Sequence, residues 1–271
     1  MKEIFSSEKL SDRLYRITEI SGVCCYLVVG DNKACLLDTC CGYGDLKAFV
    51  ATITDKPVFV VLTHGHHDHM GAAALFDEVY MNPADKPVFD SFGDMERRLA
   101  DMKGHEETSF IPDDNLVPTL TEGIRDLHEG DEFDLGGLNI KMIAAKGHTP
   151  GILCPLLIEE RTIIFGDACG VGVLLFDEFS STVSEYRESL LNLKQYENEY
   201  DRIYRNHGTF TSPKELLDNV IECCDLILSG KDDHQPVNIH GFHLFAAKEQ
   251  EYDKRLDGKE GNIKYLQEKA V

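Results

Sequence analysis

The chain has 271 residues, 42% of them hydrophobic, and a formal net charge of −21 at pH 7. So acidic a protein repels nucleic-acid phosphates, and no run approaches the ~18–20 apolar residues of a membrane span, so we expect neither a nucleic-acid nor a membrane partner. An N-terminus without an apolar signal segment, and nine cysteines without zinc-knuckle or redox spacing, favour a cytoplasmic protein with free thiols.

The first part of the chain predicts an antiparallel meander followed by a helix. Apolar residues alternate with polar ones in three short segments that glycine-containing turns separate, which is the pattern of strands. The expected strands are residues 13–20, 23–29 and 34–38. Residues 45–53 then carry apolar side chains at helical spacing and predict a short helix.

A buried strand is predicted at residues 58–62, where five apolar residues follow one another and three of them are β-branched. Directly after it, four imidazoles and one carboxylate occur within six residues. Neutral imidazoles and carboxylates are the ligands that zinc and similar divalent metals bind in proteins. The segment therefore predicts a metal site, and its candidate residues are His64, His66, Asp68 and His69.

The spacing of these side chains separates one of them from the others. Side chains two residues apart share a face of an extended chain, so His67 should point away from its neighbours and pack or hydrogen-bond structurally. His69 can join the first group from the start of a helix predicted at residues 70–76, which are small and apolar.

Residues 83–123, which follow a short strand predicted at 78–81, differ from their surroundings. Glycines and prolines interrupt them repeatedly, and only residues 85–90 and 94–102 could form short helices. No strand is predicted in this segment. We expect an insertion over the metal site that acts as a candidate lid, although a mobile surface excursion is nearly as good an interpretation.

The second half of the chain predicts strands and two capped helices. Thr182 with Glu185, and Ser212 with Glu215, form capping-box patterns that open helices at residues 183–196 and 213–229. The chain shows no repeat, low-complexity tract or linker, so a single domain spanning residues 1–271 is expected. The expected strands are residues 124–128, 138–144, 153–158, 162–165, 202–205, 238–247 and 261–266.

Three further residues of the metal-binding types lie just past the ends of predicted strands. His148, Asp167 and His207 are each followed by a glycine or another small residue, so the backbone can turn there and aim the side chain at a common point. Together with the clustered residues they exceed the four ligands of one tetrahedral ion, and they suit two ions with an open position, as in a catalytic site. The candidate ligands are His64, His66, Asp68, His69, His148, Asp167 and His207.

The order of these motifs resembles the metallo-β-lactamase-fold hydrolase superfamily, whose signature is His-x-His-x-Asp-His followed by separate His, Asp and His motifs. The resemblance covers at least residues 13–210. It implies an α/β fold, the αββα metallo-β-lactamase sandwich, with the metals at one edge between the two sheets. Asp38-Thr39 resembles the early Asp-Thr of the superfamily, a non-ligand aspartate that braces the site. Cys40 and Ala72 stand where glycine is usual, which concerns loop geometry and not the ligands.

By this resemblance, the seven candidate ligands divide between two metals. The implied metals are two Zn²⁺, although iron or manganese would also be accepted by such ligands. A water between them would be deprotonated near neutral pH and would attack a carbonyl carbon, and Asp68 would orient the hydroxide. The first metal would be held by His64, His66 and His148, the second by Asp68, His69 and His207, and Asp167 would bridge them.

Asp167 separates this chain from the true β-lactamases of the same fold, which lack a bridging aspartate. The full ligand set resembles that of the hydroxyacylglutathione hydrolases, the acyl-homoserine lactonases and the phosphodiesterases. We therefore expect a hydrolase that cleaves a small thioester, ester or lactone. A phosphodiesterase of the same fold, and a persulfide dioxygenase with a single iron, stay open as alternatives.

The sequence leaves the substrate and the assembly open. Residues 83–123 and the C-terminal strands should contact the small-molecule substrate, and either His240 or His243 could line its pocket. His105 and His128 are expected at surface or lid positions. A homodimer is compatible with the sequence, which carries no motif that requires one.

Overall fold

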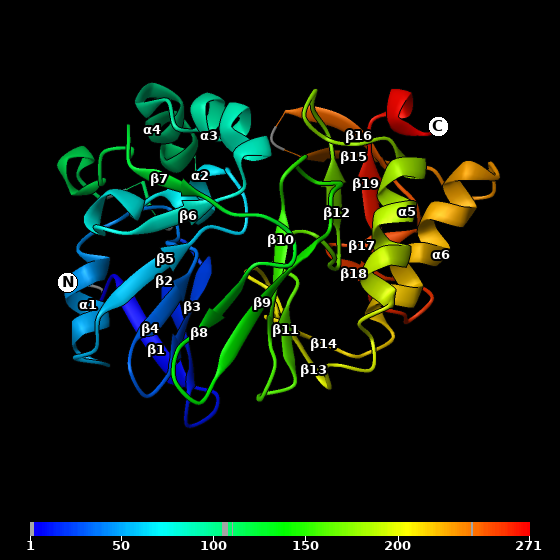
Figure 1. Cartoon of the computed structure of the whole chain (residues 1–271). Coiled ribbons are helices and arrows are strands. Elements are labelled where there is room, and N and C mark those ends of the chain that lie inside the picture. Colours follow the sequence, from blue (N-terminus) through cyan, green and yellow to red (C-terminus); the bar gives the residue numbers. More distant parts are fainter. Residues whose placement is uncertain (1–2, 105–107, 110, 240) are drawn as a thin grey trace. The chain divides into compact units, whose positions relative to one another are not determined.

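The computed structural model describes residues 3–104, 108–109, 111–239 and 241–271. The chain divides into two compact units, Met1–Ile140 with Asn206–Gly208, and Lys141–Arg205 with Thr209–Val271 (Figure 1). That the whole of residues 1–271 forms a single domain stays a prediction. No helix in the described ranges is long and apolar enough to cross a bilayer.

The first unit contains a seven-stranded sheet in the order β1-β2-β3-β4-β5-β6-β7. Its first four strands are antiparallel, which confirms the predicted meander, and β4 to β7 are parallel. The side chains of β4 are buried along the whole strand, as expected for a strand with parallel neighbours and both faces covered. The strands are β1 (Phe5–Lys9), β2 (Leu14–Glu19), β3 (Cys24–Val29), β4 (Ala34–Leu37), β5 (Val58–Val61), β6 (Val79–Met81) and β7 (Ile124–Asp126).

The helices of the first unit are short, and three of them gather near one another (Figure 1). They are α1 (Leu46–Ala51), α2 (His67–Met70), α3 (Lys86–Phe92) and α4 (Met95–Lys103), with single 3₁₀ turns at Ala73–Leu75, Pro83–Asp85 and Asp113–Asn115. The two helices predicted within residues 83–123 are confirmed as α3 and α4. No strand occurs in the described part of that segment, also as predicted.

The helix predicted at residues 70–76 is wrong. α2 begins earlier, at His67, and ends at Met70. The chain cannot continue the helix because its backbone is held against the loop that follows β4: a Cβ on Gly71 would lie 2.1 Å from the carbonyl of Cys41, and Thr39 Oγ1 accepts the N–H of Ala72 at 3.2 Å.

The second unit carries strands in the order β14-β13-β11-β10-β9, a further sheet in the order β12-β19-β16-β15, and the hairpin β17-β18. Helices α5 and α6 lie side by side in this unit (Figure 1). β8 (Glu132–Asp134) precedes β9, which begins in the first unit and ends in the second. The elements are β9 (Asn139–Ala144), β10 (Leu153–Leu157), β11 (Thr162–Ile164), β12 (Val173–Leu175), α5 (Val183–Lys194), β13 (Arg202–Tyr204), β14 (Thr211–Ser212), α6 (Leu216–Leu228), β15 (Gln235–Ile239), β16 (Phe242–Ala246), β17 (Gln250–Glu251), β18 (Lys254–Arg255) and β19 (Ile263–Tyr265), with a last 3₁₀ turn at Gln267–Lys269.

One of the two predicted capping boxes forms. The N–H of Glu185 donates to Thr182 Oγ1 at 3.3 Å, and the N–H of Thr182 donates to Glu185 Oε2 at 3.1 Å. The box predicted at Ser212 is wrong, because α6 has Glu215 as its N-cap and no side-chain cap. Ser212 ends β14 instead, where its hydroxyl accepts a hydrogen bond from Arg205 Nε at 2.7 Å.

Two other strand predictions fail, one because a turn interrupts the alternation of apolar and polar residues and one because the strand is mostly polar. The single strand predicted at residues 238–247 is wrong: β15 and β16 form an antiparallel hairpin there, and Gly241 adopts φ +83° in the connection. β1 escapes prediction because it is a polar edge strand whose side chains after Phe5 are exposed.

All nine cysteines lie within the described residues, and all are free and buried. Burial raises the pKa of the Cys223 thiol to about 12, so this thiol is uncharged at neutral pH. The free thiols expected from the sequence are present at all nine positions.

A buried carboxylate, Glu19, holds the loop that follows β4. Its Oε1 accepts the N–H groups of Gly42 and Tyr43, each at 3.0 Å, and its Oε2 accepts the hydroxyl of Ser21 at 2.7 Å. Burial raises the pKa of Glu19 above its usual value of 4.5, although these hydrogen bonds oppose the shift. The folded state therefore holds the Glu19 proton more tightly than the unfolded state does.

This shift predicts a pH-dependent effect of Glu19→Gln. The raised pKa contributes stability that is fully present below pH 4.5 and is lost as the pH rises through the folded-state pKa. Because Gln does not titrate, the free energy of unfolding of the wild type should fall relative to that of Glu19→Gln as the pH rises through this window. Urea unfolding at a series of pH values measures the difference. The exposed control Glu129→Gln should show no such trend, and a constant difference at Glu19 would contradict the argument.

Candidate metal centre

Four candidate ligands of the first unit follow the carboxyl end of β5, beside a buried aspartate that follows the neighbouring parallel strand β4. Asp38 comes directly after β4, and the segment from Thr63 to His69 follows β5. Binding sites of proteins with parallel sheets usually lie at the carboxyl ends of the strands, because the loops that follow the strands are free to face a bound ion or molecule there. The parallel pairing of two neighbouring strands thus brings segments about 25 residues apart together, as the 2.7 Å bond from the N–H of Thr63 to Asp38 Oδ1 shows.

Asp38 is the brace of this edge. Its Oδ2 accepts the hydroxyl of Thr63 at 2.9 Å and the side-chain amide of Asn206 at 3.2 Å, and it lies 2.9 Å from His69 Nδ1. The backbone of Asp38 adopts φ +65°, a left-handed conformation that Asp tolerates better than most residues. This is the role that the resemblance implied for Asp38.

The contact with Asp38 determines the tautomer of His69. A carboxylate oxygen can only accept, so Nδ1 of His69 carries the proton and Nε2 presents its lone pair. That lone pair lies 3.3 Å from His207 Nε2 and 3.7 Å from Asp68 Oδ2, while His207 Nε2 lies 3.3 Å from Asp68 Oδ2. Three metal-binding atoms of one unit therefore converge.

The spacing of these three atoms fits a divalent ion. Around a tetrahedral zinc with bonds of about 2.0–2.1 Å, neighbouring ligand atoms lie about 3.3–3.5 Å apart. Asp68, His69 and His207 match this spacing to within a few tenths of an ångström. Burial alone would raise the pKa of Asp68, but the imidazoles of His69, His207 and His67 hold it well below its usual range. Asp68 is thus a carboxylate at neutral pH, the form that binds metal.

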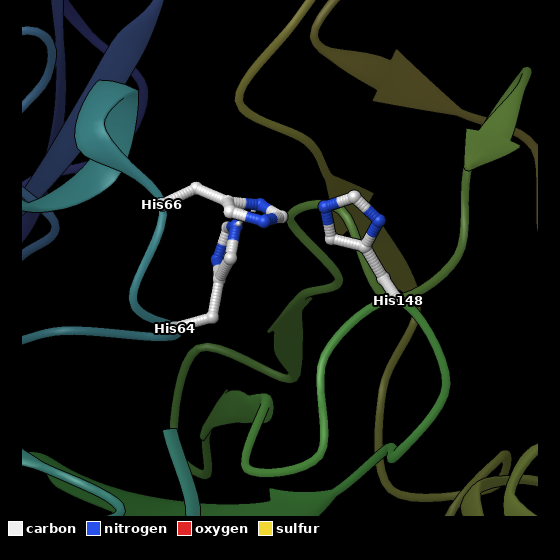
Figure 2. Close-up of side chains that lie close together, drawn as sticks. All are labelled: His64, His66 and His148. Atoms are coloured by element: carbon white, nitrogen blue, oxygen red, sulfur yellow. Dashed lines mark hydrogen bonds between the residues drawn. The ribbon is translucent and has the colours of Figure 1, made fainter. Parts of the chain in front are cut away.

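A second pair of ligand atoms lies in the same loop. Thr63 Oγ1 donates to Asp38 and therefore accepts from His64 Nδ1 at 3.1 Å. His64 Nε2 then presents its lone pair, 3.1 Å from His66 Nδ1. Figure 2 shows these two imidazoles on the loop after β5. Both side chains are buried, as expected for ligands that a protein shields from bulk water.

The second unit carries the two remaining candidates, His148 and Asp167. His148, also drawn in Figure 2, follows β9. Its Nδ1 donates to the carbonyl of Leu174 in β12 at 2.8 Å, so its Nε2 presents the lone pair. Asp167 follows β11, and its Oδ2 lies 3.7 Å from His148 Nε2. Within this unit, therefore, the structure brings the two predicted ligands together.

The family model of the Metallo-beta-lactamase superfamily matches residues 21–201 of the chain. The chain belongs to this superfamily. It has the α/β metallo-β-lactamase sandwich that the motifs implied, and its fold is similar to the solved structure of a metallo-beta-lactamase from Pontibacter korlensis, with a TM-score of 0.59 at 14% identity over 82% of this chain and 99% of that one.

Several curated relatives are hydrolases by name. The chain is 26% identical to hydroxyacylglutathione hydrolase GloC of Haemophilus influenzae, over 69% of this chain and 86% of that protein. It is 25% identical to acyl-coenzyme A thioesterase MBLAC2 of Homo sapiens, over 59% of this chain and 63% of that protein. A beta-lactamase-like protein 2 homolog of Caenorhabditis elegans is 26% identical over 80% of this chain. The match covers 67% of that longer protein. This chain is a metal-dependent hydrolase with a divalent-metal site.

The histidines outside the ligand set of this superfamily have other contacts. His67 lies apart from the converging ligand atoms, as predicted: its Nε2 is 3.3 Å from Asp101 Oδ2 on α4, and burial lowers its pKa although Asp68 and Asp101 oppose the shift. His243 is exposed and contacts Asn238 Oδ1 across the β15-β16 hairpin, and His128 is exposed. His105 and His240 lie outside the described residues.

Several residues that shape this site carry no motif that sequence reasoning could have used. Thr63 and Asn206 act through Asp38, and Leu174 acts through its backbone. Thr63 and Asn206 directly precede the candidate ligands His64 and His207, and this adjacency is the local signal that could have pointed to them.

Proposed function

We propose that this chain is a dinuclear metallohydrolase that cleaves small acyl thioesters in preference to other substrates, with esters and lactones as related substrates. The observation that carries the metal assignment is the convergence of Asp68, His69 and His207 at 3.3–3.7 Å, with the tautomer of His69 set by Asp38. The thioester assignment rests on the names of two relatives, a hydroxyacylglutathione hydrolase and an acyl-coenzyme A thioesterase.

The proposed ligand sets follow the motifs of the superfamily. The first zinc would be held by His64, His66 and His148, the second by Asp68, His69 and His207, and Asp167 would bridge them. Two observations support this assignment: His64 Nε2 and His66 Nδ1 lie 3.1 Å apart, and the Nδ1–H of His148 donates to Leu174, which leaves its Nε2 as the ligand atom. The donors are imidazoles and carboxylates, the set that zinc prefers, although iron and manganese accept it too.

Two divalent ions bound in this way would supply a hydroxide nucleophile near neutral pH and stabilise the negative charge that develops on the carbonyl oxygen. The chain's own residues then have defined tasks. Asp68 stays ionised and can accept a hydrogen bond from the attacking water, which orients it. Asp38 and Thr63 hold His69 and His64 in the tautomers whose Nε2 atoms face the ligand set.

A thioester suits a site of this composition. A thiol has an ordinary pKa of about 8.5, so a thiolate leaves without a proton from a protein acid. The net charge of −21 disfavours the approach of polyanionic substrates, since unscreened repulsion raises the cost of encounter. Near the site this argument weakens, because two dications outweigh a diffuse surface charge and could hold a single phosphate.

One experiment tests the metal content and the substrate class together. Protein purified without added metal should contain close to two metals per chain, with zinc above iron and manganese in elemental analysis. Under equal metal loading, turnover should be faster on acyl thioesters and lactones than on bis(p-nitrophenyl) phosphate. A phosphodiester that is better by tenfold, about 1.4 kcal/mol of transition-state stabilisation, would make the chain a phosphodiesterase. One tightly bound iron with oxygen consumption on a persulfide would make it a dioxygenase.

A further inference from the structure

Helices α3 and α4 and the turn before them contact the metal loop, residues 64–71, at successive points along its length. All of these contacts lie within the first unit. They come from a segment, residues 83–103, that the sequence predicted to be part of a lid. A lid should touch the loop only loosely and tolerate change. This segment instead contacts the loop through buried, hydrogen-bonded side chains and close backbone packing.

The first contact is made by a buried carboxylate between two candidate ligands. Asp85 is fully buried, and its Oδ2 accepts the N–H of Gly65 at 2.9 Å. Gly65 is the residue between His64 and His66. A Cβ on Gly65 would lie 2.7 Å from the backbone nitrogen of Phe89, so only glycine allows α3 to pack this closely on the loop.

The next contacts follow the loop toward its end. The ring of Phe92 at the end of α3 lies 4.2 Å from the ring of His66, measured between centroids. Asp101 on α4 lies 3.3 Å from Nε2 of His67. Each of these residues thus contacts a different histidine of the loop, and each comes from a different helix of the insertion.

The last contact is made by the fully buried guanidinium of Arg98. Its Nη2 donates to the carbonyls of Gly71 and Cys41, each at 3.0 Å. Its Nη1 donates to the carbonyl of Val117 at 3.0 Å and to Thr119 Oγ1 at 2.8 Å. A cation without exposed surface is retained only where several acceptors satisfy it. Arg98 therefore ties the end of the metal loop to both the loop after β4 and the later part of the insertion.

We propose that Asp85 is a positioning residue of the metal site, and that with Arg98 it fixes the two ends of the loop that carries His64, His66, Asp68 and His69. The Gly65 peptide joins two ligands, so its orientation determines whether both rings face one ion. Asp85 holds that peptide, and the affinity for metal therefore depends on a residue that does not itself contact the metal. The inference rests on the proposed metal function of these ligands.

The test compares zinc binding by the full-length wild type, Asp85→Ala, Asp85→Asn and the control Asp90→Ala, which removes an exposed carboxylate from α3, the helix that begins after Asp85. Each protein is stripped of metal, checked for folding by circular dichroism, and titrated with zinc against a chromophoric chelator. Asp85→Ala should weaken binding of one zinc by about tenfold or more. Asp85→Asn retains an acceptor for Gly65 and should restore most of the affinity, and Asp90→Ala should match the wild type.

The outcomes separate this inference from the proposed function. A wild type that binds no zinc refutes both. A wild type that binds two zinc ions, together with a folded Asp85→Ala that binds both equally well, refutes the positioning role alone. If Asp85→Ala does not fold without metal, Asp85→Ser replaces it, since Ser suits the position before α3 but its hydroxyl is too short to reach Gly65. Unfolding of both variants would also overturn the inference, because Asp85 would then support the whole unit and not the loop.

Discussion

Replacing Asp167 with Asn should leave the chain folded but reduce its metal content from two ions to one. The substitution keeps the shape of the side chain and removes the negative charge that would lie between two cations. Bridging two ions typically supplies several kcal/mol to the transition state, so hydrolysis should fall on the order of 100-fold or more. Elemental analysis and turnover of a thioester measure the two effects. Asp114→Asn, at an exposed position, serves as the control and should change neither.

Two results would contradict the bridging role of Asp167. Unchanged metal content with unchanged activity would show that Asp167 is not a ligand. Unchanged metal content with lost activity would place Asp167 beside the substrate and not between the metals. The circular dichroism spectrum of the apo protein should match that of the wild type in either case.

The second large effect is expected at Asp38. Asp38→Ala removes the acceptor of the Thr63 N–H, the Thr63 hydroxyl and the Asn206 amide in a fully buried place. Leaving such groups without a partner should lower the free energy of unfolding by about 3–5 kcal/mol. The left-handed backbone at this position disfavours Ala further. Urea unfolding of the metal-free protein measures the loss.

Asp38→Asn separates the stability of the fold from the orientation of His69. Asn tolerates the left-handed backbone and keeps one acceptor, so most of the stability should return. Its amide nitrogen, however, can only donate, and when it faces His69 Nδ1 it favours the tautomer with the proton on Nε2. Zinc affinity should then fall by about 10–100-fold although the protein is folded. An Asp38→Asn protein that binds zinc like the wild type would show that the tautomer of His69 does not depend on Asp38.

The candidate ligands could be named from the sequence because their signal is local. Four imidazoles and a carboxylate directly after a buried strand rarely occur together except at a metal site, and the sharp turns at residues 147–151, 166–167 and 206–208 carry the same signal. The central strands could be predicted for a similar reason: β3, β4 and β5 are short, apolar and bounded by turn residues, so burial on both faces follows from composition alone. Asp38 was placed by its motif, and its contacts with His69 and Thr63 agree with that placement.

Contacts between distant segments could not be predicted, because their residues are ordinary in type. Asp85 and Gly65 are 20 residues apart, and Arg98 and Cys41 are 57 apart. A lone Asp before a helix and an Arg within one are most often exposed, so neither suggested a buried role. The helix predicted at residues 70–76 failed for the same reason, since packing of Gly71 against Cys41 overrides the helical propensity of the small residues that follow.

The amino-acid sequence by itself pointed to the superfamily, to the seven candidate metal ligands, and to most of the strands whose ends carry them. These depend on residue type and on spacing along the chain, which a sequence records directly. The tertiary structure alone decided which ring nitrogen of His64, His69 and His148 presents its lone pair, and which residues hold the metal loop in place. Tautomers depend on partners such as Asp38, Thr63 and Leu174, and those partners become neighbours only when strands and helices pack.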